Sequence, residues 1–499
     1  MLNSVYLWYF KNRMKGIEYF MRNPHLVQEQ WFYKLLQAGK KTTYGRECGF
    51  ESITHLESFK NNVPVVEYHD LLPYIQRIRN GEKNVLWNTP IRLFSKSSGT
   101  VSEQSKYIPV SYESLHSCHF KAGKDTYSLY CNAYPNSKIF QGYALGMGGH
   151  LSKDYANNMY SGDLSALLMK ELPYFAQRKR KPNLHIALMD EWESKIEKLA
   201  ETTISSNITH ILGVPSWTLL LLRRILEKTQ KQSIGSVWEN LEVFFHGGVS
   251  FDPYHAEYER IISSGMRYFQ TYNASEGYFS IQDQPNAKDM LLLLDHGIFY
   301  EFMPMTEIGK ESPKLLSLNE IELNTNYGLV ITTNGGLWRY LIGDTIVFTS
   351  KDPFRIRVTG RTRYFINAVG EELIFENVEK ALQDVLSQCD VVVEEYTGGP
   401  VYAENDLNAR HEWVFEFSKA PDDIRRFTEM FDLALQKVNS DYAAKRYQNM
   451  ILEMPIVHVA PSGTFYQWMR KRGKLGGQHK VPRLTNDRSH LDSILPLLM

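Results

Sequence analysis

Apolar residues recur at helical spacing through the first 90 or so residues of the chain. Val27, Trp31, Leu35 and Leu36 fall on one face of such a helix, because side chains three and four positions apart lie on the same side. Turn-prone residues such as those at 44–46 separate one helical run from the next. The pattern therefore predicts a mostly helical amino-terminal segment.

Between about residue 90 and residue 350, short β-rich runs alternate with helical ones, which is typical of an α/β fold. The strand candidates are residues 241–245, 266–271 and 328–333, and the last of them returns as a second strand after a turn. Each candidate ends in polar or glycine-rich residues. Because ligands of open α/β sheets bind at the carboxyl ends of the strands, this arrangement predicts a ligand site there.

The pattern changes near residue 360. Residues 355–359 alternate as a strand, which residues 360–363 are expected to interrupt. The elements expected farther on are helices at residues 378–385 and 424–438 and strands at residues 413–417 and 451–459. We therefore expect an α/β protein with a large multi-sheet amino-terminal domain over residues 1–360 and a smaller, mobile α/β carboxy-terminal domain over residues 361–499.

The length and the charge of the chain narrow the class of protein. A chain of 499 residues exceeds what one ordinary hydrophobic core supports, which agrees with two domains. Lys+Arg and Asp+Glu number 56 each, so the net charge gives no electrostatic reason to expect nucleic acid or an anionic membrane as the partner. Neither is therefore among the expected partners.

Cysteine usage and the first residues bear on the compartment. The four cysteines form no Cys-x-x-Cys pair, so neither a disulfide framework nor a zinc site is indicated, and free thiols suit a reducing cytoplasm. The apolar run near the amino terminus precedes its charges Lys11, Arg13 and Lys15, the reverse of a secretory signal. No apolar stretch approaches the ~20 residues that span a bilayer. We expect a soluble, cytoplasmic protein.

One cluster of hydroxyls surrounds a glycine. Ser97, Ser98, Gly99 and Thr100 are followed six residues later by Lys106. The glycine lets backbone amides approach a phosphate, and the hydroxyls and the lysine supply donors and charge. By itself, such a cluster is more often a plain turn. The P-loop spacing GxxxxGK[ST] does not occur in the chain, so any nucleotide is held in another way.

Two further segments have side chains that suit a nucleotide. Tyr272, Ser275 and Glu276 follow a predicted strand; an exposed tyrosine face can stack on a purine, and a glutamate can reach a magnesium ion that bridges phosphates. Asp344 follows a glycine at a hairpin tip, where its carboxylate can accept both ribose hydroxyls. In isolation, each segment is more often an ordinary strand end or turn.

These segments occur together in one order, with Gly247 and Gly248 after a strand and Gly360-Arg361 after the hairpin. Together they resemble the acyl-adenylate-forming superfamily, which includes the acyl-CoA synthetases. A narrower resemblance is to the Gretchen Hagen Three family of acyl acid amido synthetases. It rests on the segments IQRIRNGEKNVLW, TYNASEGYFS, LWRYLIGDTIVFT and GGQHKVPRL. The resemblance runs over nearly the whole chain, and the closing Gly-x-x-Lys-x-Pro-Arg segment is its most specific part.

The resemblance implies a large domain of the acyl-adenylate-forming type with a mobile lid domain, and it assigns roles to matched positions. The residues implied to contact the nucleotide are Ser97, Ser98, Gly99, Thr100, Lys106, Gly247, Gly248, Tyr272, Ser275, Asp344 and Arg361. Among them, Tyr272 would stack on adenine opposite the two glycines, and Arg361 would lie at the hinge. Glu276 would hold Mg, and Lys480 would move in to support adenylation, because negative charge builds on the α-phosphate during attack.

The implied reaction uses ATP and two small molecules. A carboxylic acid attacks the α-phosphate and releases pyrophosphate, and an amine, expected to be that of an amino acid, then takes the acyl group and releases AMP. An acyl-CoA synthetase is one alternative, although the Gln-His-Lys-x-Pro-Arg ending argues against it. A non-catalytic binding protein of the same fold is the other, which Glu276, Asp344 and Lys480 together disfavour. The sequence does not specify an oligomeric state.

Other polar residues are expected to be unremarkable. No histidine spacing predicts a metal site, and His150, His246 and His479 are weak candidates for the base that accepts the proton of the amine. Lys121 and Lys124 follow the first motif on a predicted helix, where they could face an acyl carboxylate, although we expect both to be solvated. Glu103 departs from the glycines usual in plant relatives, so the path of the loop after Thr100 is open.

Overall fold

The computed structural model describes most of the chain. The described residues are 2–97, 106–154, 158–189, 191–248, 251–262, 265–362, 365–366, 368, 371, 373–401, 409–439, 442–443, 446, 452–472, 481–485 and 487–498. For residues 2–8, 97, 192–193, 216 and 252–253 it describes the backbone alone. Within these residues, no helix combines the length and the apolar character that crossing a membrane requires.

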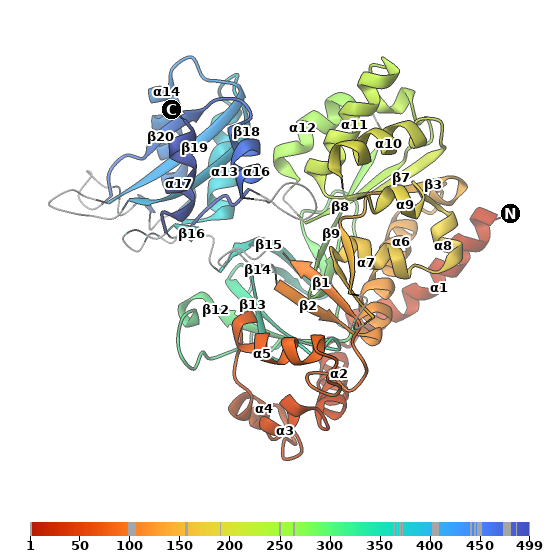
Figure 1. Cartoon of the computed structure of the whole chain (residues 1–499). Coiled ribbons are helices and arrows are strands. Elements are labelled where there is room, and N and C mark those ends of the chain that lie inside the picture. Colours follow the sequence, from red (N-terminus) through yellow and green to blue (C-terminus); the bar gives the residue numbers. More distant parts are fainter. Residues whose placement is uncertain are drawn as a thin grey trace. The chain divides into compact units, whose positions relative to one another are not determined.

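Five helices precede the first strand, as the helical spacing predicts (Figure 1). They are α1 (Leu2–Arg22), α2 (Pro24–Gly39), α3 (Thr43–Glu47), α4 (Leu56–Asn62) and α5 (Tyr68–Arg79). The turn expected at residues 44–46 is wrong, because these residues form α3. The Thr42 hydroxyl accepts a hydrogen bond of 3.0 Å from the Gly45 amide and so caps the first turn of that helix.

One large sheet runs through the chain. Its strands are β3 (Tyr143–Gly146), β6 (Arg180–Lys181), β7 (Ile208–Gly213), β8 (Val243–Gly247), β9 (Arg267–Ala274), β10 (Gly277–Ile281), β11 (Met290–Leu292), β12 (Ile298–Pro304), β13 (Asn326–Thr333), β14 (Tyr340–Lys351) and β15 (Phe354–Arg361). Their order is β12-β13-β14-β15-β11-β10-β9-β8-β7-β3-β6. The strands from β6 to β9 run parallel, whereas β10 and β11 pair antiparallel with their neighbours. The carboxyl ends of β3, β7, β8 and β9 therefore share one edge of the sheet.

Helices cover both faces of the parallel part of this sheet. They are α6 (Phe120–Ala133), α8 (Tyr174–Arg178), α9 (Leu184–Ala187), α10 (Trp192–Thr203), α11 (Pro215–Thr229) and α12 (Asp252–Ile261). The helix α7 (Leu164–Glu171) instead packs on a second sheet. On one face lie α10, α11 and α12 (Figure 1). Their side chains Leu199, Leu222 and Tyr258 share a buried cluster with Phe244 of β8. Because side chains alternate along a strand, Phe245 points to the opposite face. There it meets α6, which follows a π-helical turn at Ser114–His119.

A second, four-stranded sheet carries the first motif. Its strands are β1 (Leu93–Ser97), β2 (Lys106–Val110), β4 (Leu151–Asp154) and β5 (Met159–Gly162), in the order β2-β1-β5-β4. β1 and β2 form an antiparallel pair in which Ser97 lies opposite Lys106. The two residues that flank positions 98–105 are therefore neighbours.

The chain divides into two compact units. The first comprises residues 1–325, 329–342 and 347–357, and the second residues 326–328, 343–346 and 358–499. The expected α/β class is confirmed, with a large multi-sheet amino-terminal part and a carboxy-terminal α/β part. The boundary between residues 360 and 361 stays a prediction.

The second unit is a small layered α/β structure. Its elements are β16 (Phe365–Ile366), β17 (Leu373–Ile374), α13 (Phe375–Leu386), β18 (Val392–Val401), β19 (Arg410–Lys419), α14 (Ile424–Val438), β20 (Ile456–Ala460), α16 (Thr464–Lys471) and α17 (Ser489–Ile494). Trp413 and Phe415 of β19 pack on α13 and α14, whereas Val414 packs with Trp468 of α16 and Leu491 of α17. Both faces of this sheet are thus covered by helices.

Strand limits differ from those expected by several residues, as β15 and β20 illustrate. β15 continues through Gly360 to Arg361 rather than ending before Gly360. The last strand begins at Ile456, five residues later than the pattern indicated. Local alternation locates a strand, but the hydrogen bonds of its neighbours fix where it begins and ends.

Candidate functional site

The strand that leads into the first motif meets the Tyr-x-x-Ser-Glu motif in the first unit. Ser95, two residues before Ser97 on β1, donates a hydrogen bond of 2.9 Å from its hydroxyl to that of Ser275. Both serines are buried, Ser95 completely. This bond joins the strand that leads into residues 98–105 to the turn between β9 and β10, although the two serines are 180 residues apart.

Glycines occupy the carboxyl end of β8, next to that turn. Gly247 pairs with Thr271 in the parallel register of β8 and β9, and a Cβ atom added to it would lie 2.4 Å from the Thr271 carbonyl oxygen. The chain therefore requires glycine at this position. Gly248 has φ +84°, a left-handed conformation that glycine adopts without strain. The two glycines therefore allow the end of β8 to lie close to Thr271, the residue before Tyr272.

Tyr272 and Glu276 lie around the β9–β10 turn. Tyr272 is 8% exposed, and its ring centroid lies 4.9 Å from that of Phe279 at an interplanar angle of 49°. The motif predicted an exposed tyrosine face, but most of the Tyr272 ring is covered in this structure. Glu276 is 7% exposed. The polar groups gathered at this turn are the Glu276 carboxylate and the hydroxyls of Ser275 and of Ser95 on β1. All of them offer oxygen, the ligand atom that Mg²⁺ prefers.

Two predicted nucleotide residues contact each other in the second unit. Asp344 on β14 forms an ion pair with Arg361 at the end of β15, with 2.8 Å between Oδ1 and Nε. The Asp344 side chain is 9% exposed, whereas that of Arg361 is 39% exposed. The arginine thus holds the carboxylate in place and partly neutralises it.

Several predicted residues lie outside the described part of the chain. These are Ser98, Gly99, Thr100, Glu103, His479 and Lys480, and for Ser97 the backbone alone is described. Lys106, at the start of β2, has its ammonium 5.7 Å from the ring centroid of Tyr68. The roles assigned to all of these residues stay predictions.

His246 is a poor candidate for a general base. Its ring stacks on Phe251 with centroids 4.3 Å apart, and it is 4% exposed. Burial lowers the pKa of His246 to about 3, so the ring holds a proton weakly at neutral pH. Because side chains alternate along β8, the His246 ring points to the same face as Phe244, which α12 covers, and away from α6.

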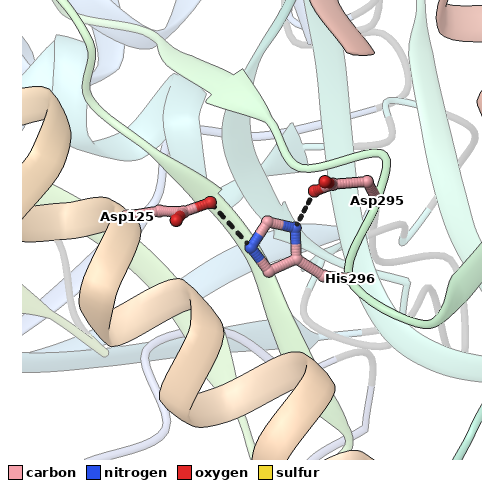
Figure 2. A group of neighbouring side chains, drawn as sticks. All are labelled: Asp125, Asp295 and His296. Atoms are coloured by element: carbon pink, nitrogen blue, oxygen red, sulfur yellow. Dashed lines mark ion pairs between the residues drawn. The ribbon is translucent and has the colours of Figure 1, made fainter. Parts of the chain in front are cut away.

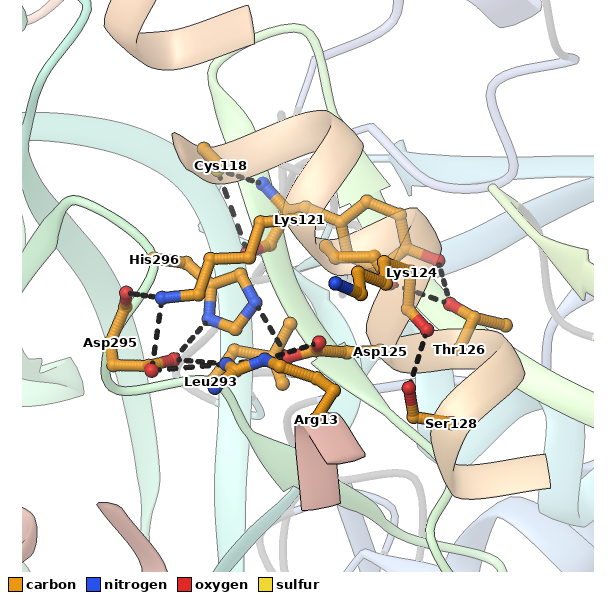
Figure 3. A network of polar contacts seen from close by, with 12 residues as sticks. Arg13, Cys118, Lys121, Lys124, Asp125, Thr126, Ser128, Leu293, Asp295 and His296 are labelled. Atoms are coloured by element: carbon orange, nitrogen blue, oxygen red, sulfur yellow. Dashed lines mark hydrogen bonds and ion pairs between the residues drawn. The ribbon is translucent and has the colours of Figure 1, made fainter. Parts of the chain in front are cut away.

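A network of charged side chains connects α6 to α1 (Figure 3). No sequence pattern predicted this network. Arg13 donates to Asp125 from Nε at 2.7 Å, and its Nη2 also lies 3.0 Å from Asp295. Lys121 lies 2.9 Å from the Asp295 carboxylate and donates to the Asp295 carbonyl oxygen at 2.5 Å. The expectation that Lys121 is solvated was therefore wrong. Lys124 lies over the ring of Tyr9, 4.0 Å from its centroid.

His296 lies between the two carboxylates of this network (Figure 2). Its Nε2 is 3.1 Å from Asp125 and its Nδ1 is 2.9 Å from Asp295, and both His296 and Asp125 are fully buried. Burial alone would raise the pKa of Asp295, but His296, Lys121 and Arg13 outweigh it and lower that pKa.

The two aspartates and the histidine are close enough together to hold a metal ion. Arg13 and Lys121 already balance the charge of both carboxylates, however, and a cation would have to displace one of them or bind against their repulsion. We therefore interpret the cluster as an ion-pair network that fixes α6.

Models of one family match the chain along most of its length. The GH3 family N-terminal domain matches residues 13–265, the GH3 family central domain residues 291–361, and the GH3 family C-terminal domain residues 376–489. The chain belongs to the GH3 family. This confirms the family that the motifs indicated.

Curated relatives of this GH3 chain extend over most of its length. Indole-3-acetic acid-amido synthetase GH3.3 of Arabidopsis thaliana is 25% identical over 94% of this chain and 91% of its own. Jasmonoyl--L-amino acid synthetase JAR4 of Nicotiana attenuata is 24% identical over 67% of this chain and 68% of its own.

Solved structures share the fold. A GH3.15 acyl acid amido synthetase superimposes with a TM-score of 0.81 at 17% identity, covering 98% of this chain and 96% of that one. A 2-hydroxyisobutyryl-CoA ligase in complex with 2-HIB-AMP gives a TM-score of 0.60 at 14% identity, covering 95% and 91%. The GH3 chain therefore has the fold expected from its resemblance to the acyl-adenylate-forming enzymes.

Proposed function

We propose that this chain is an ATP-dependent acyl acid amido synthetase, which adenylates a carboxylic acid and transfers the acyl group to the amine of an amino acid. The observation that carries the proposal is the Ser95–Ser275 hydrogen bond. It brings the strand before the Ser-Ser-Gly-Thr motif to the turn that holds Glu276, beside the carboxyl end of β8. Membership of a family whose relatives are named amido synthetases supports the same reaction.

In the first step, a carboxylate oxygen of the acid attacks the α-phosphorus of ATP, and the bond to pyrophosphate breaks. Ser97 to Thr100 with Lys106 would bind the phosphates, and Tyr272 would stack on the adenine beside Gly247 and Gly248. Asp344 would accept the ribose hydroxyls while Arg361 holds it. Lys480 would stabilise the charge that develops on the α-phosphate, the kind of electrostatic stabilisation that lowers such barriers most.

In the second step, the amine nitrogen attacks the acyl carbon of the mixed anhydride, AMP leaves, and the amine loses a proton. Mg²⁺, when bound, would neutralise phosphate charge; Glu276, in its turn of oxygen donors, is the residue that would hold it.

Four free cysteines, Cys48, Cys118, Cys131 and Cys389, support a reducing compartment such as the cytoplasm.

Pyrophosphate exchange into ATP tests the first step. We expect the purified protein with Mg-ATP and an acid from a panel to exchange labelled pyrophosphate, and then to release AMP and an amide when amino acids are added. A thioester in place of the amide, formed on addition of CoA, would instead identify an acyl-CoA synthetase. The absence of exchange with every acid would contradict adenylation altogether.

Asp344→Ala should raise the KM for ATP in this assay. The ribose hydroxyls would lose a charged acceptor, which contributes about 1.5–3 kcal/mol, so we expect an increase of roughly tenfold or more. Asp422→Ala, which removes an exposed carboxylate of the same unit, should leave the KM unchanged. An Asp344→Ala protein with the wild-type KM would show that the ribose assignment is wrong.

A further inference from the structure

Arg180 of β6 is buried without an acidic partner. The residue is 8% exposed. Within the described residues, its guanidinium makes one hydrogen bond, from Nη1 to the Pro182 carbonyl oxygen at 3.0 Å, and its Nε is buried with no partner. Burial lowers the pKa of Arg180, and no carboxylate of the described chain opposes that change. Because an unpaired charge is costly to remove from water, the fold alone leaves this guanidinium unbalanced.

The other buried arginines of the described chain are paired. Arg339 forms an ion pair of 3.0 Å with Glu301, and Arg446 forms one of 2.7 Å with Asp432. Both carboxylates are themselves buried. The chain thus supplies a counter-ion to these two guanidinium groups but not to that of Arg180.

The row of side chains that contains Arg180 offers no negative charge. Arg180 pairs with Ala144 of β3, which pairs with His210 of β7, and paired residues of neighbouring strands point to the same face. Burial lowers the pKa of His210 to about 3, so this ring is neutral at pH 7. β6 is the last strand in the order of the large sheet. Arg180 therefore ends its row at an edge of the sheet.

Three more basic residues adjoin Arg180 in the sequence Arg178-Lys-Arg-Lys181. The exposed Arg178 lies over the ring of Tyr174, 4.7 Å from its centroid. Lys179 donates to a backbone carbonyl oxygen, and the ammonium of Lys181 lies over an aromatic ring. In the part of the chain that the structure describes, these contacts involve no carboxylate. Four positive charges are therefore gathered here without a counter-ion.

We propose that Arg180 is the centre of a binding site for a doubly charged oxyanion, namely phosphate or the phosphate group of a monoester. Arginine binds such groups through two parallel N–H···O bonds. The Nε and Nη2 atoms of Arg339 bind Glu301 in this way, and the same two atoms of Arg180 make no hydrogen bond with the described residues. The neighbouring cations favour a dianion over a carboxylate, which carries one charge. This inference is independent of the proposed function.

Thermal unfolding with and without phosphate tests the site. At equal ionic strength, about 20 mM phosphate in place of chloride should raise the Tm of the wild type by about 2–4 °C more than that of Arg180→Met, because a bound anion stabilises the folded state. Phosphate at the nucleotide site would affect both proteins alike. In chloride, Arg180→Met should have a Tm about 1–3 °C above that of the wild type, since an unpaired buried charge is replaced by an apolar side chain.

Arg180→Lys keeps the charge but not the two parallel donors, so it should fold and bind phosphate about tenfold more weakly in calorimetric titration. Arg22→Met, which removes an exposed arginine at the end of α1, is the control and should bind phosphate as the wild type does. An Arg180→Met protein with the full phosphate response, or one with a lowered Tm in chloride, would overturn the proposal.

Titration with inorganic phosphate, glucose 6-phosphate and acetate distinguishes the sources of the anion. Tighter binding of glucose 6-phosphate than of phosphate would identify a phosphorylated metabolite as the ligand, and binding of phosphate alone would identify the free ion. Acetate that binds as tightly as phosphate would overturn the preference for a dianion. If none of the three bound in a manner that depends on Arg180, the site would be excluded and the proposed function would be unaffected.

Discussion

Lys480→Ala should lower the rate of acyl-adenylate formation by roughly two to four orders of magnitude while ATP and acid still bind. Each tenfold loss corresponds to ~1.4 kcal/mol of stabilisation that is lost in the transition state alone. The motif Gly-x-x-Lys-x-Pro-Arg places Lys480 in a glycine-flanked segment after the last strand of the second unit. An ammonium that meets the α-phosphate only as charge develops contributes to kcat rather than to substrate binding.

Supplying preformed acyl-adenylate provides the decisive comparison. The Lys480→Ala protein should then form amide at a rate near that of the wild type, because the step with the large charge build-up has been bypassed. Lys471→Ala, an exposed lysine at the end of α16, is the matched control and should not affect either reaction. Equal losses from ATP and from adenylate would instead indicate a structural or amine-binding role, and an active Lys480→Ala enzyme would remove the lysine from the mechanism.

Residues near Lys480 explain how its segment is tied to the small sheet. The Gly398 amide of β18 donates to the Arg483 carbonyl oxygen at 2.8 Å, and Thr397 donates to the Pro482 carbonyl oxygen at 2.7 Å. Arg483 also forms an ion pair of 2.6 Å with Glu395. The chain is therefore fixed to β18 at Pro482 and Arg483, two and three residues after Lys480. The proposed catalytic lysine thus lies close in sequence to an anchored part of the motif.

Much of the fold could be predicted because its signals are local. Alternating Trp413, Phe415 and Phe417 indicated β19, and the helical spacing of Val378, Leu382 and Val385 indicated α13. These patterns appear in the sequence since each element buries one face of its own side chains. Strand limits such as the start of β20 depend on hydrogen bonds to a neighbouring strand, which no local pattern specifies.

The candidate site was predictable only where a motif held the chemistry. Ser275 and Glu276 were found because they stand together after a strand, but the Ser95–Ser275 bond joins residues 180 positions apart.

The ion-pair network around His296 gave no sequence signal at all, since Arg13 and Asp295 are 282 residues apart. Asp125→Asn should nevertheless lower the free energy of unfolding of the first unit by about 1.5–3 kcal/mol, because Arg13 loses its charged, fully buried partner and keeps only Asp295. Glu257→Gln, which breaks an exposed pair with Arg223, should cost only about 0–1 kcal/mol. Urea denaturation followed by tryptophan fluorescence measures both losses.

The pH dependence of this stabilisation has a definite sign. The pKa of Asp295 is lowered in the folded protein, so its contribution is fully present above the ordinary aspartate pKa of about 4 and is lost as the pH falls through the lower folded value. The difference in stability between wild type and Asp295→Asn should therefore be constant from about pH 5 to 7 and decrease in more acidic solution. A difference that instead grows on acidification would contradict ion pairing.

If Zn²⁺ stabilised the wild type but not Asp125→Asn, the cluster would be a metal site, because an ion-pair network already balanced by Arg13 and Lys121 gains nothing from a further cation.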